Sequence, residues 1–303
     1  MPPRIHVGPE PERLFTEAVE AAGAVVAAEP AEAEAIVWLT GEPAGLVSVL
    51  HPGVRWVQLS SAGVEQWLTD GAIDADRRWT SAAGAYGETV ADHALALALA
   101  GRRRLHECAR ADSWSRELEG RPLFGCTVAV VGAGAIGRAL IRLLEPWGCR
   151  IVAVTRSGRD VEGAAVSLPA SKLDEVWPQA DVVVVAAPAT DATRHLVGAP
   201  ELARFRSDAW LVNVARGTLV DTEALADALA AGRLAGAALD VTDPEPLPDG
   251  HPLWREPRAL ITPHVANTDD IRRRTLADFT RENIRRYAAG EELRGLIDPE
   301  RGY

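Results

Sequence analysis

The residues best suited to chemistry in this sequence are an arginine, a glutamate and a histidine in its second half. They are Arg216 in NVARGTLVD, Glu245 in DVTDPEPLP and His264 in ITPHVANT. Imidazole titrates at about pH 6.5 in model peptides, and a neighbouring carboxylate favours its charged form, so His264 beside Glu245 could donate a proton near neutral pH. Arg216 could hold a substrate carboxylate and polarise a carbonyl. The trio predicts carbonyl reduction with His264 as the general acid.

Each member of the trio has an ordinary alternative: a structural histidine, a loop carboxylate between two prolines, and a surface arginine at a helix start. Their shared placement favours catalysis, because each follows an apolar run that predicts a buried strand, at 210–214, 236–240 and 259–262. Ligands of open parallel sheets bind beyond the carboxyl ends of the strands. We therefore expect the three side chains at one sheet edge. The other histidines lack such a setting and are interpreted as structural or exposed: His6, His51, His93, His106, His195 and His251.

A glycine-rich turn precedes these residues in the chain. In VAVVGAGAIGRALIRLL, Gly132, Gly134 and Gly137 form G-x-G-x-x-G directly after a predicted strand and at the start of a predicted helix. The first glycine permits the turn, the second lets backbone approach a pyrophosphate, and the third lets helix and strand pack closely. The helix N-terminus adds amide donors for phosphate. The motif predicts a dinucleotide site; the alternative is a tight structural turn.

The stretch VTRSGR, residues 154–159, bears on which dinucleotide binds. NAD sites carry an acid about 20 residues after the glycine motif, where it accepts hydrogen bonds from the adenine ribose. Here that position is Thr155, which has no charge to repel a 2′-phosphate, and Arg156 and Arg159 follow it. A guanidinium can donate two parallel hydrogen bonds to phosphate. We expect NADP as the cofactor, with NAD as the weaker alternative; an ordinary pair of solvated arginines is the other interpretation.

Composition argues against several classes of function. The chain of 303 residues has a formal net charge of −11, which disfavours nucleic acid or an acidic membrane surface as a partner. Its three cysteines lack metal-ligand spacing and are expected as free thiols, and no His/Cys cluster or HExxH predicts a metal. MPPRIHVGPEPERLF lacks an apolar signal core, and no run of about 18 apolar residues occurs. We expect a soluble cytoplasmic protein.

The pattern of apolar runs predicts an α/β fold. Helical spacing occurs at 10–23, 91–105 and about 269–289. Alanine and leucine alternate at 94–100 as in a strand, but we predict a buried helix because no β-branched residue occurs there. Continuous apolar runs such as DVVVVAAP suit parallel strands covered on both faces. Strands are expected at 4–7, 35–39, 56–59, 127–131, 150–154, 181–186, 210–214, 236–240 and 259–262.

Together, these motifs resemble the D-isomer-specific 2-hydroxyacid dehydrogenase family over nearly the whole chain. The stretches that carry the resemblance follow the family's order and spacing: GAGAIGRAL, AAPATDATRHLVG, LVNVARGTLVDTEALADAL, GAALDVTDPEPLPDGHPLW and ITPHVANT. The resemblance implies two Rossmann-like domains with parallel sheets. The NADP-binding domain, 99–270, is inserted in a flavodoxin-like substrate-binding domain, 1–98 and 271–303. A homodimer is also implied, formed through the helix 88–101 and the arm 102–122.

The resemblance assigns roles residue by residue. The family's catalytic arginine, glutamate and histidine match Arg216, Glu245 and His264. Backbone amides around Ala62 and Gly63, in LSSAGVEQW, are implied to hold the substrate carboxylate. The implied cofactor contacts outside the glycines and arginines already named are Ala135, Ile136, Thr155, Ala187, Pro188, Val214, Ala215 and Asp240, the last near the nicotinamide amide.

Within the family, the chain is most similar to NADP-dependent glyoxylate/hydroxypyruvate reductases, through its short length, the arginines after the second strand and the ending IDPERGY. The implied reaction is hydride transfer from NADPH to a small 2-keto acid, giving the D-2-hydroxy acid. Departures from the family pattern at Tyr86, Asp92 and 265–267 concern the substrate more than the reaction, and Trp38 could cap the substrate or belong to the core. A bulkier 2-keto acid and a nucleotide-sensing corepressor with this fold are the alternatives.

Overall fold

The computed structural model describes residues 1–117 and 119–302, which form two compact units. Unit 1 comprises Met1–Tyr86 and the chain from Thr268 onward, and unit 2 comprises Gly87–Asn267. The domain boundaries predicted from the sequence, after residues 98 and 270, fall slightly later. The first difference arises because helix α4, Gly87–Arg102, packs as one piece against elements of unit 2: helix α6 (Ala135–Leu144) and strands β10 (Trp210–Asn213) and β11 (Gly236–Leu239).

Unit 1 is built on a sheet of five parallel strands in the order β2-β1-β3-β4-β5. This is the flavodoxin-like order, and it confirms the predicted fold class. Ligands of such sheets bind where the strand order reverses, beyond the carboxyl ends of β1 and β3. The bounds are β1 Arg4–Gly8, β2 Val25–Val26, β3 Ala35–Trp38, β4 Trp56–Leu59 and β5 Arg78–Thr80.

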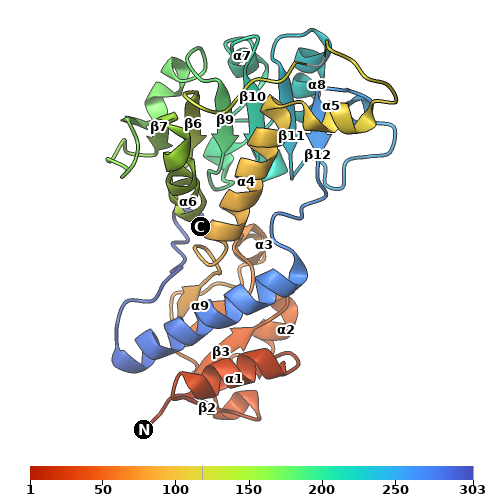
Figure 1. The fold of residues 1–303 in the computed structure, drawn as a ribbon. Coiled ribbons are helices and arrows are strands. Elements are labelled where there is room, and N and C mark those ends of the chain that lie inside the picture. Colours follow the sequence, from red (N-terminus) through yellow and green to blue (C-terminus); the bar gives the residue numbers. More distant parts are fainter. Residues whose placement is uncertain (118, 303) are drawn as a thin grey trace. The chain divides into compact units, whose positions relative to one another are not determined.

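The C-terminal helix belongs to unit 1 although it follows unit 2 in the chain. It packs along α1, as Figure 1 shows. The buried Asn283 on this helix donates a hydrogen bond of 2.8 Å to Gln58 of β4, and Tyr287 stacks on Trp56 with ring centroids 5.1 Å apart. Trp38 lies in the core of this unit with 2 % of its surface exposed. The helix bounds are α1 Arg13–Ala21, α2 Pro43–Val47, α3 Glu65–Thr69 and α9 Asp269–Ala289.

Unit 2 is built on seven parallel strands in the order β12-β11-β10-β9-β6-β7-β8. The order matches the Rossmann arrangement with one further strand, and it reverses between β6 and β9. The crevice for a dinucleotide is therefore expected beyond the carboxyl ends of these two strands. The bounds are β6 Thr127–Val131, β7 Arg150–Thr155, β8 Val166–Pro169, β9 Val182–Val185, β10 Trp210–Asn213, β11 Gly236–Leu239 and β12 Ala259–Ile261.

Helices cover both faces of the sheet of unit 2. On one face α4 packs beside α6 and across β10 (Figure 1). On the other, Leu225 and Leu229 of α8 share a core cluster with Val131 and Val185. All four residues of β9 are buried, as expected for a strand covered on both faces. The alternating stretch 94–100 is helical, as predicted. The remaining helices are α5 Leu105–Arg110, α6 Ala135–Leu144, α7 Ala199–Leu202 and α8 Thr222–Ala230.

Three strands were not predicted from the sequence: β2, β5 and β8. Each lies at the edge of its sheet and is two to four residues long, so none produces a continuous apolar run. Such short strands lack the run of several apolar residues that identified the longer strands. Within the described residues, no helix combines the length and apolarity that a membrane crossing requires.

Candidate active site

Glu245 and His264 lie in contact at the carboxyl edge of the sheet of unit 2. The imidazole Nδ1 of His264 is 2.7 Å from Oε1 of Glu245. An ionised carboxylate can only accept a hydrogen bond, so Nδ1 carries a proton and the glutamate orients the ring through it. Both side chains are about half exposed, at 51 % and 42 %. The ring nitrogen Nε2 is therefore the atom available for proton exchange with a ligand.

The turn after β12 holds His264 in an unusual backbone conformation. Its φ is 52°, in the left-handed region that a non-glycine residue occupies only with support from its surroundings. The support comes from Asp240, which directly follows β11. The amide of His264 donates to the carbonyl oxygen of Asp240 at 2.9 Å. The carboxylate of Asp240 accepts from the amides of Val265 at 2.9 Å and Ala266 at 3.0 Å.

Asp240 is anionic and almost wholly enclosed, with 1 % of its side chain exposed. Burial alone raises its pKa, but hydrogen bonds from His93, Thr262 and the turn amides outweigh burial and lower the pKa to about 2. The hydroxyl of Thr262 lies 2.6 Å from Oδ1. The resemblance implied a contact between Asp240 and the nicotinamide amide. In the structure, both carboxylate oxygens hold the turn that carries His264.

His93 is a residue of this cluster that the sequence analysis interpreted as structural or exposed. It lies on α4, and its Nε2 is 3.1 Å from Thr262 Oγ1 and 3.3 Å from Asp240 Oδ1. The chain separation between His93 and Thr262 is 169 residues, so spacing carried no signal. The hint in the sequence was an imidazole directly before the apolar helical stretch 94–100.

Arg216 follows β10 in a turn shaped by the fully buried Asn213. The amide group of Asn213 donates to the carbonyl oxygen of Arg216 at 2.9 Å, and its Oδ1 accepts from the amide of Ala215 at 3.1 Å. A Cβ placed on Gly217 would lie 1.8 Å from the carbonyl oxygen of Thr242. The loops after β10 and β11 are therefore in backbone contact. This contact brings the arginine loop beside the segment that carries Glu245.

Two glycines of the motif are closely packed against neighbouring atoms, and the third has free space beside it. Gly132 has φ +101°, and a Cβ there would lie 2.5 Å from the amide nitrogen of Ala187. A Cβ on Gly137 would lie 2.4 Å from the carbonyl oxygen of Gly132, so helix and strand meet closely. By contrast, a Cβ on Gly134 would meet no atom within 4 Å. There is therefore room beside Gly134, directly before the first turn of α6, for a pyrophosphate to approach the backbone.

The remaining cofactor candidates lie along the same edge. Val131 and Val154 pair in register, so the turn after β7 lies beside the glycine motif. Thr155 is 9 % exposed, and its hydroxyl accepts a hydrogen bond of 2.9 Å from the amide of Gly158. This closes a turn on which Arg156 and Arg159 are exposed. The candidates Pro188, Val214 and Ala215 follow β9 and β10, whose ends reach this edge, and Ile136 lies in the first turn of α6.

The predicted carboxylate-binding turn, around Ala62 and Gly63, belongs to unit 1, where it follows β4. Tyr86 donates a hydrogen bond of 2.9 Å to the carbonyl oxygen of Ser60, which anchors the start of this turn. Burial raises the pKa of Tyr86 to about 12, against a smaller lowering by the charge of Arg272. The phenol is therefore neutral. The role of Ala62 and Gly63 in substrate binding stays a prediction.

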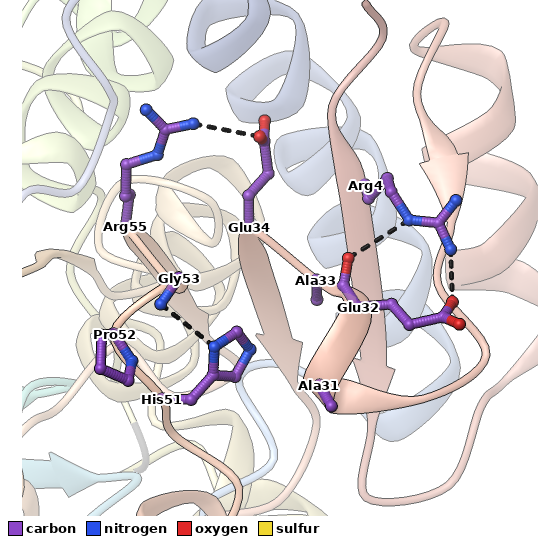
Figure 2. Close-up of a pocket in the computed structure, with 9 residues that line it drawn as sticks. All are labelled: Arg4, Ala31, Glu32, Ala33, Glu34, His51, Pro52, Gly53 and Arg55. Carbon is purple, nitrogen blue, oxygen red and sulfur yellow. Dashed lines mark hydrogen bonds and ion pairs between the residues drawn. The ribbon is translucent and has the colours of Figure 1, made fainter.

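A cavity of about 400 Å³ lies elsewhere in unit 1 (Figure 2). It opens near the amino ends of β1, β3 and β4, at the sheet edge opposite to the one where ligands bind. Its charges are paired: Arg55 with Glu34 at 3.1 Å, and Arg4 with Glu32. Because none of the predicted site residues lines it, we assign it no role in the site. Among the described residues, no group of three or more His, Cys, Asp and Glu could hold a metal ion.

A family model, curated proteins and solved structures that are similar to this chain all belong to one group of enzymes. Residues 93–266 match the family model described as D-isomer specific 2-hydroxyacid dehydrogenase, NAD binding domain. A glyoxylate reductase from Thermofilum pendens is 34 % identical over 82 % of this chain and 76 % of its own length. A D-isomer specific 2-hydroxyacid dehydrogenase from Xanthobacter autotrophicus, solved with NADPH and MES, is 30 % identical with a TM-score of 0.87, covering 100 % of both chains. An NADPH-dependent glyoxylate/hydroxypyruvate reductase from Sinorhizobium meliloti, solved with NADP and sulfate, is 26 % identical, with a TM-score of 0.80 over 99 % of this chain and 100 % of that one.

Proposed function

Because this chain belongs to the D-isomer specific 2-hydroxyacid dehydrogenase family, we propose that it reduces a small 2-keto acid to the D-2-hydroxy acid with NADPH as the hydride donor. The observation that carries the proposal is the contact of 2.7 Å between His264 and Glu245. It lies on the sheet that also presents the glycine motif. A proton donor and a dinucleotide cradle at one sheet edge are what carbonyl reduction requires.

His264 acts as the general acid. NADPH, when bound, supplies hydride to the carbonyl carbon, which leaves negative charge on the carbonyl oxygen. His264 donates the proton on Nε2 to that oxygen, and Glu245 stabilises the imidazolium form before the transfer. A positioned acid of this kind contributes a factor of about 10²–10⁴ in rate. In the reverse direction the neutral imidazole accepts the proton from the hydroxy acid.

Arg216 supplies the positive charge for the substrate. Its turn is fixed by Asn213 and by the backbone contact at Gly217. From there the guanidinium binds the substrate carboxylate and polarises the carbonyl.

The cofactor preference follows from the turn after β7. The space beside Gly134, at the start of α6, fits a pyrophosphate. At the ribose position the chain has Thr155, whose hydroxyl closes the turn, followed by Arg156 and Arg159. Two guanidinium groups, and a threonine instead of a carboxylate at position 155, favour a 2′-phosphate over a ribose hydroxyl. The NADPH and NADP complexes of the two similar structures are consistent with this preference.

Glyoxylate and hydroxypyruvate are the proposed substrates, because the similar proteins from Thermofilum pendens and Sinorhizobium meliloti carry these names. The test is a panel of 2-keto acids, small and bulky, with NADPH and with NADH, followed by absorbance at the nicotinamide band. We expect turnover of the small acids with higher kcat/KM for NADPH. A clear preference for NADH would reject the role of Arg156 and Arg159.

His264→Ala tests the acid directly. We expect kcat to fall by a factor of about 10²–10⁴, with NADPH still bound as measured by its fluorescence. The matched control is His51→Ala, a histidine in the cavity of Figure 2, which should retain wild-type turnover. Undiminished turnover in His264→Ala would reject this assignment.

A further inference from the structure

The hydrogen bonds around Thr262 determine whether His93 Nε2 acts as a donor or an acceptor. Asp240 is ionised, so it can only accept, and the Thr262 hydroxyl at 2.6 Å must give it its single proton. Both oxygens can then only accept from a third group. His93 Nε2 lies 3.1 Å from the Thr262 oxygen and 3.3 Å from Asp240 Oδ1. His93 therefore carries a proton on Nε2 and donates it to this pair.

The hydrogen bond from His93 matters because the Asp240 carboxylate is a buried charge that accepts several other hydrogen bonds. It accepts from Thr262 and from the amides of Val265 and Ala266, which form the turn after His264. Buried charges must be fully hydrogen-bonded to hold one geometry. The described partners of the carboxylate other than His93 come from the segment 262–266 itself. His93 comes from α4 and ties that segment to a helix packed across the sheet.

The turn has a backbone conformation that depends on such bracing. The backbone of His264 is in the left-handed region, and its amide donates to the carbonyl oxygen of the same Asp240. The ring reaches Glu245 only from this turn. A shift of Asp240 would therefore move the imidazole relative to its partner carboxylate.

We propose that His93 is a positioning residue for the proton donor. Through its Nε2 proton it fixes the pair formed by Asp240 and Thr262, and through that pair the turn that places His264 against Glu245. The inference rests on the proposed function, because it concerns the geometry of the same proton transfer. In this scheme His93 contacts neither His264 Nε2 nor the substrate carbonyl oxygen, the two atoms between which the proton moves.

The experiment compares His93→Leu, which removes the donor, with His93→Gln, whose amide nitrogen lies about as far along the side chain as Nε2. One hydrogen bond to a charged group is equivalent to a factor of about 10 or more. We expect His93→Leu to lower kcat about tenfold, with the KM of the keto acid and the Kd of NADPH unchanged. His93→Gln should restore most of the kcat. In NMR spectra of the ¹⁵N-histidine-labelled protein, the signal of the Nδ1 proton of His264, which is hydrogen-bonded to Glu245, should lose intensity in His93→Leu but not in His93→Gln.

Two further variants keep the test decisive. His93→Asn has a shorter amide that does not reach Thr262, and it should lose kcat as His93→Leu does, even if the leucine variant fails to fold. His106→Leu is the matched control, since His106 packs on Trp210 with ring centroids 5.6 Å apart, and it should keep wild-type kcat. Wild-type kcat in His93→Leu or His93→Asn, or equal loss in His93→Gln, overturns the inference. A wild-type chain that binds NADPH but reduces no keto acid contradicts the proposed function instead.

Discussion

Replacing Asp240 by asparagine removes the charge that the turn around His264 is built to bind. The hydrogen bonds of the cluster lower the pKa of Asp240 from 3.8 to about 2 although burial opposes them. At about 1.4 kcal/mol for each pKa unit, that difference is equivalent to about 2 to 3 kcal/mol in favour of the folded state. In Asp240→Asn, an amide N–H group would also face the amide of Val265 or Ala266, which leaves donors without acceptors. We expect unit 2 to lose about 3 kcal/mol of stability at neutral pH.

The pH dependence has a defined sign. Asp240 has a lower pKa in the folded chain than in the unfolded one, so its contribution is complete above about pH 4 and is lost as the pH falls towards 2. The difference in unfolding free energy between the wild type and Asp240→Asn should therefore be largest near pH 7. It should shrink steadily below pH 4, because protonated aspartic acid and asparagine are both neutral.

The assay is urea unfolding followed by circular dichroism at pH 7 and at pH 3, with NADPH affinity and kcat measured on the same samples. We expect a lower midpoint, a kcat reduced by about 100-fold and nearly unchanged NADPH affinity. Equal midpoints for the two proteins at pH 7 would refute the reasoning. A loss of NADPH affinity with full stability would instead show that Asp240 serves the nicotinamide amide.

Three further substitutions test other parts of the site. Glu245→Gln should lower kcat about 100-fold and leave NADPH affinity intact, because the imidazolium loses its counter-charge; steady-state kinetics will show whether KM moves instead. Gly217→Ala should unfold unit 2 or abolish expression, since its Cβ would lie 1.8 Å from a carbonyl oxygen of Thr242; a normal thermal midpoint would contradict this. Gly132→Ala should abolish NADPH binding in fluorescence titrations, given its φ of +101° and the 2.5 Å approach to Ala187; retained affinity would show that the turn can relax.

The expected positions of the candidate residues agree with the structure where one short segment contains both the structural signal and the chemical group. Gly132, Gly134 and Gly137 lie on a strand, a turn and a helix that are adjacent in the chain, so their separate roles followed from spacing. Glu245 and His264 were expected at one edge because both follow apolar runs, and their side chains are 2.7 Å apart. The strands β2, β5 and β8 were missed because they are short and none contains a continuous apolar run.

The sequence by itself determined the fold class, the glycine cradle and the residue types able to transfer a proton, because each depends on local periodicity or on chemistry that a side chain carries anywhere. Only the tertiary structure decided what Asp240 and His93 do. His93 Nε2 lies 3.3 Å from Asp240 Oδ1. This contact links α4, the first helix of unit 2 in the chain, to the segment that follows β11. Such a contact exists only when the packing of the whole unit has brought the two segments together. A buried charge can then collect hydrogen bonds from both segments.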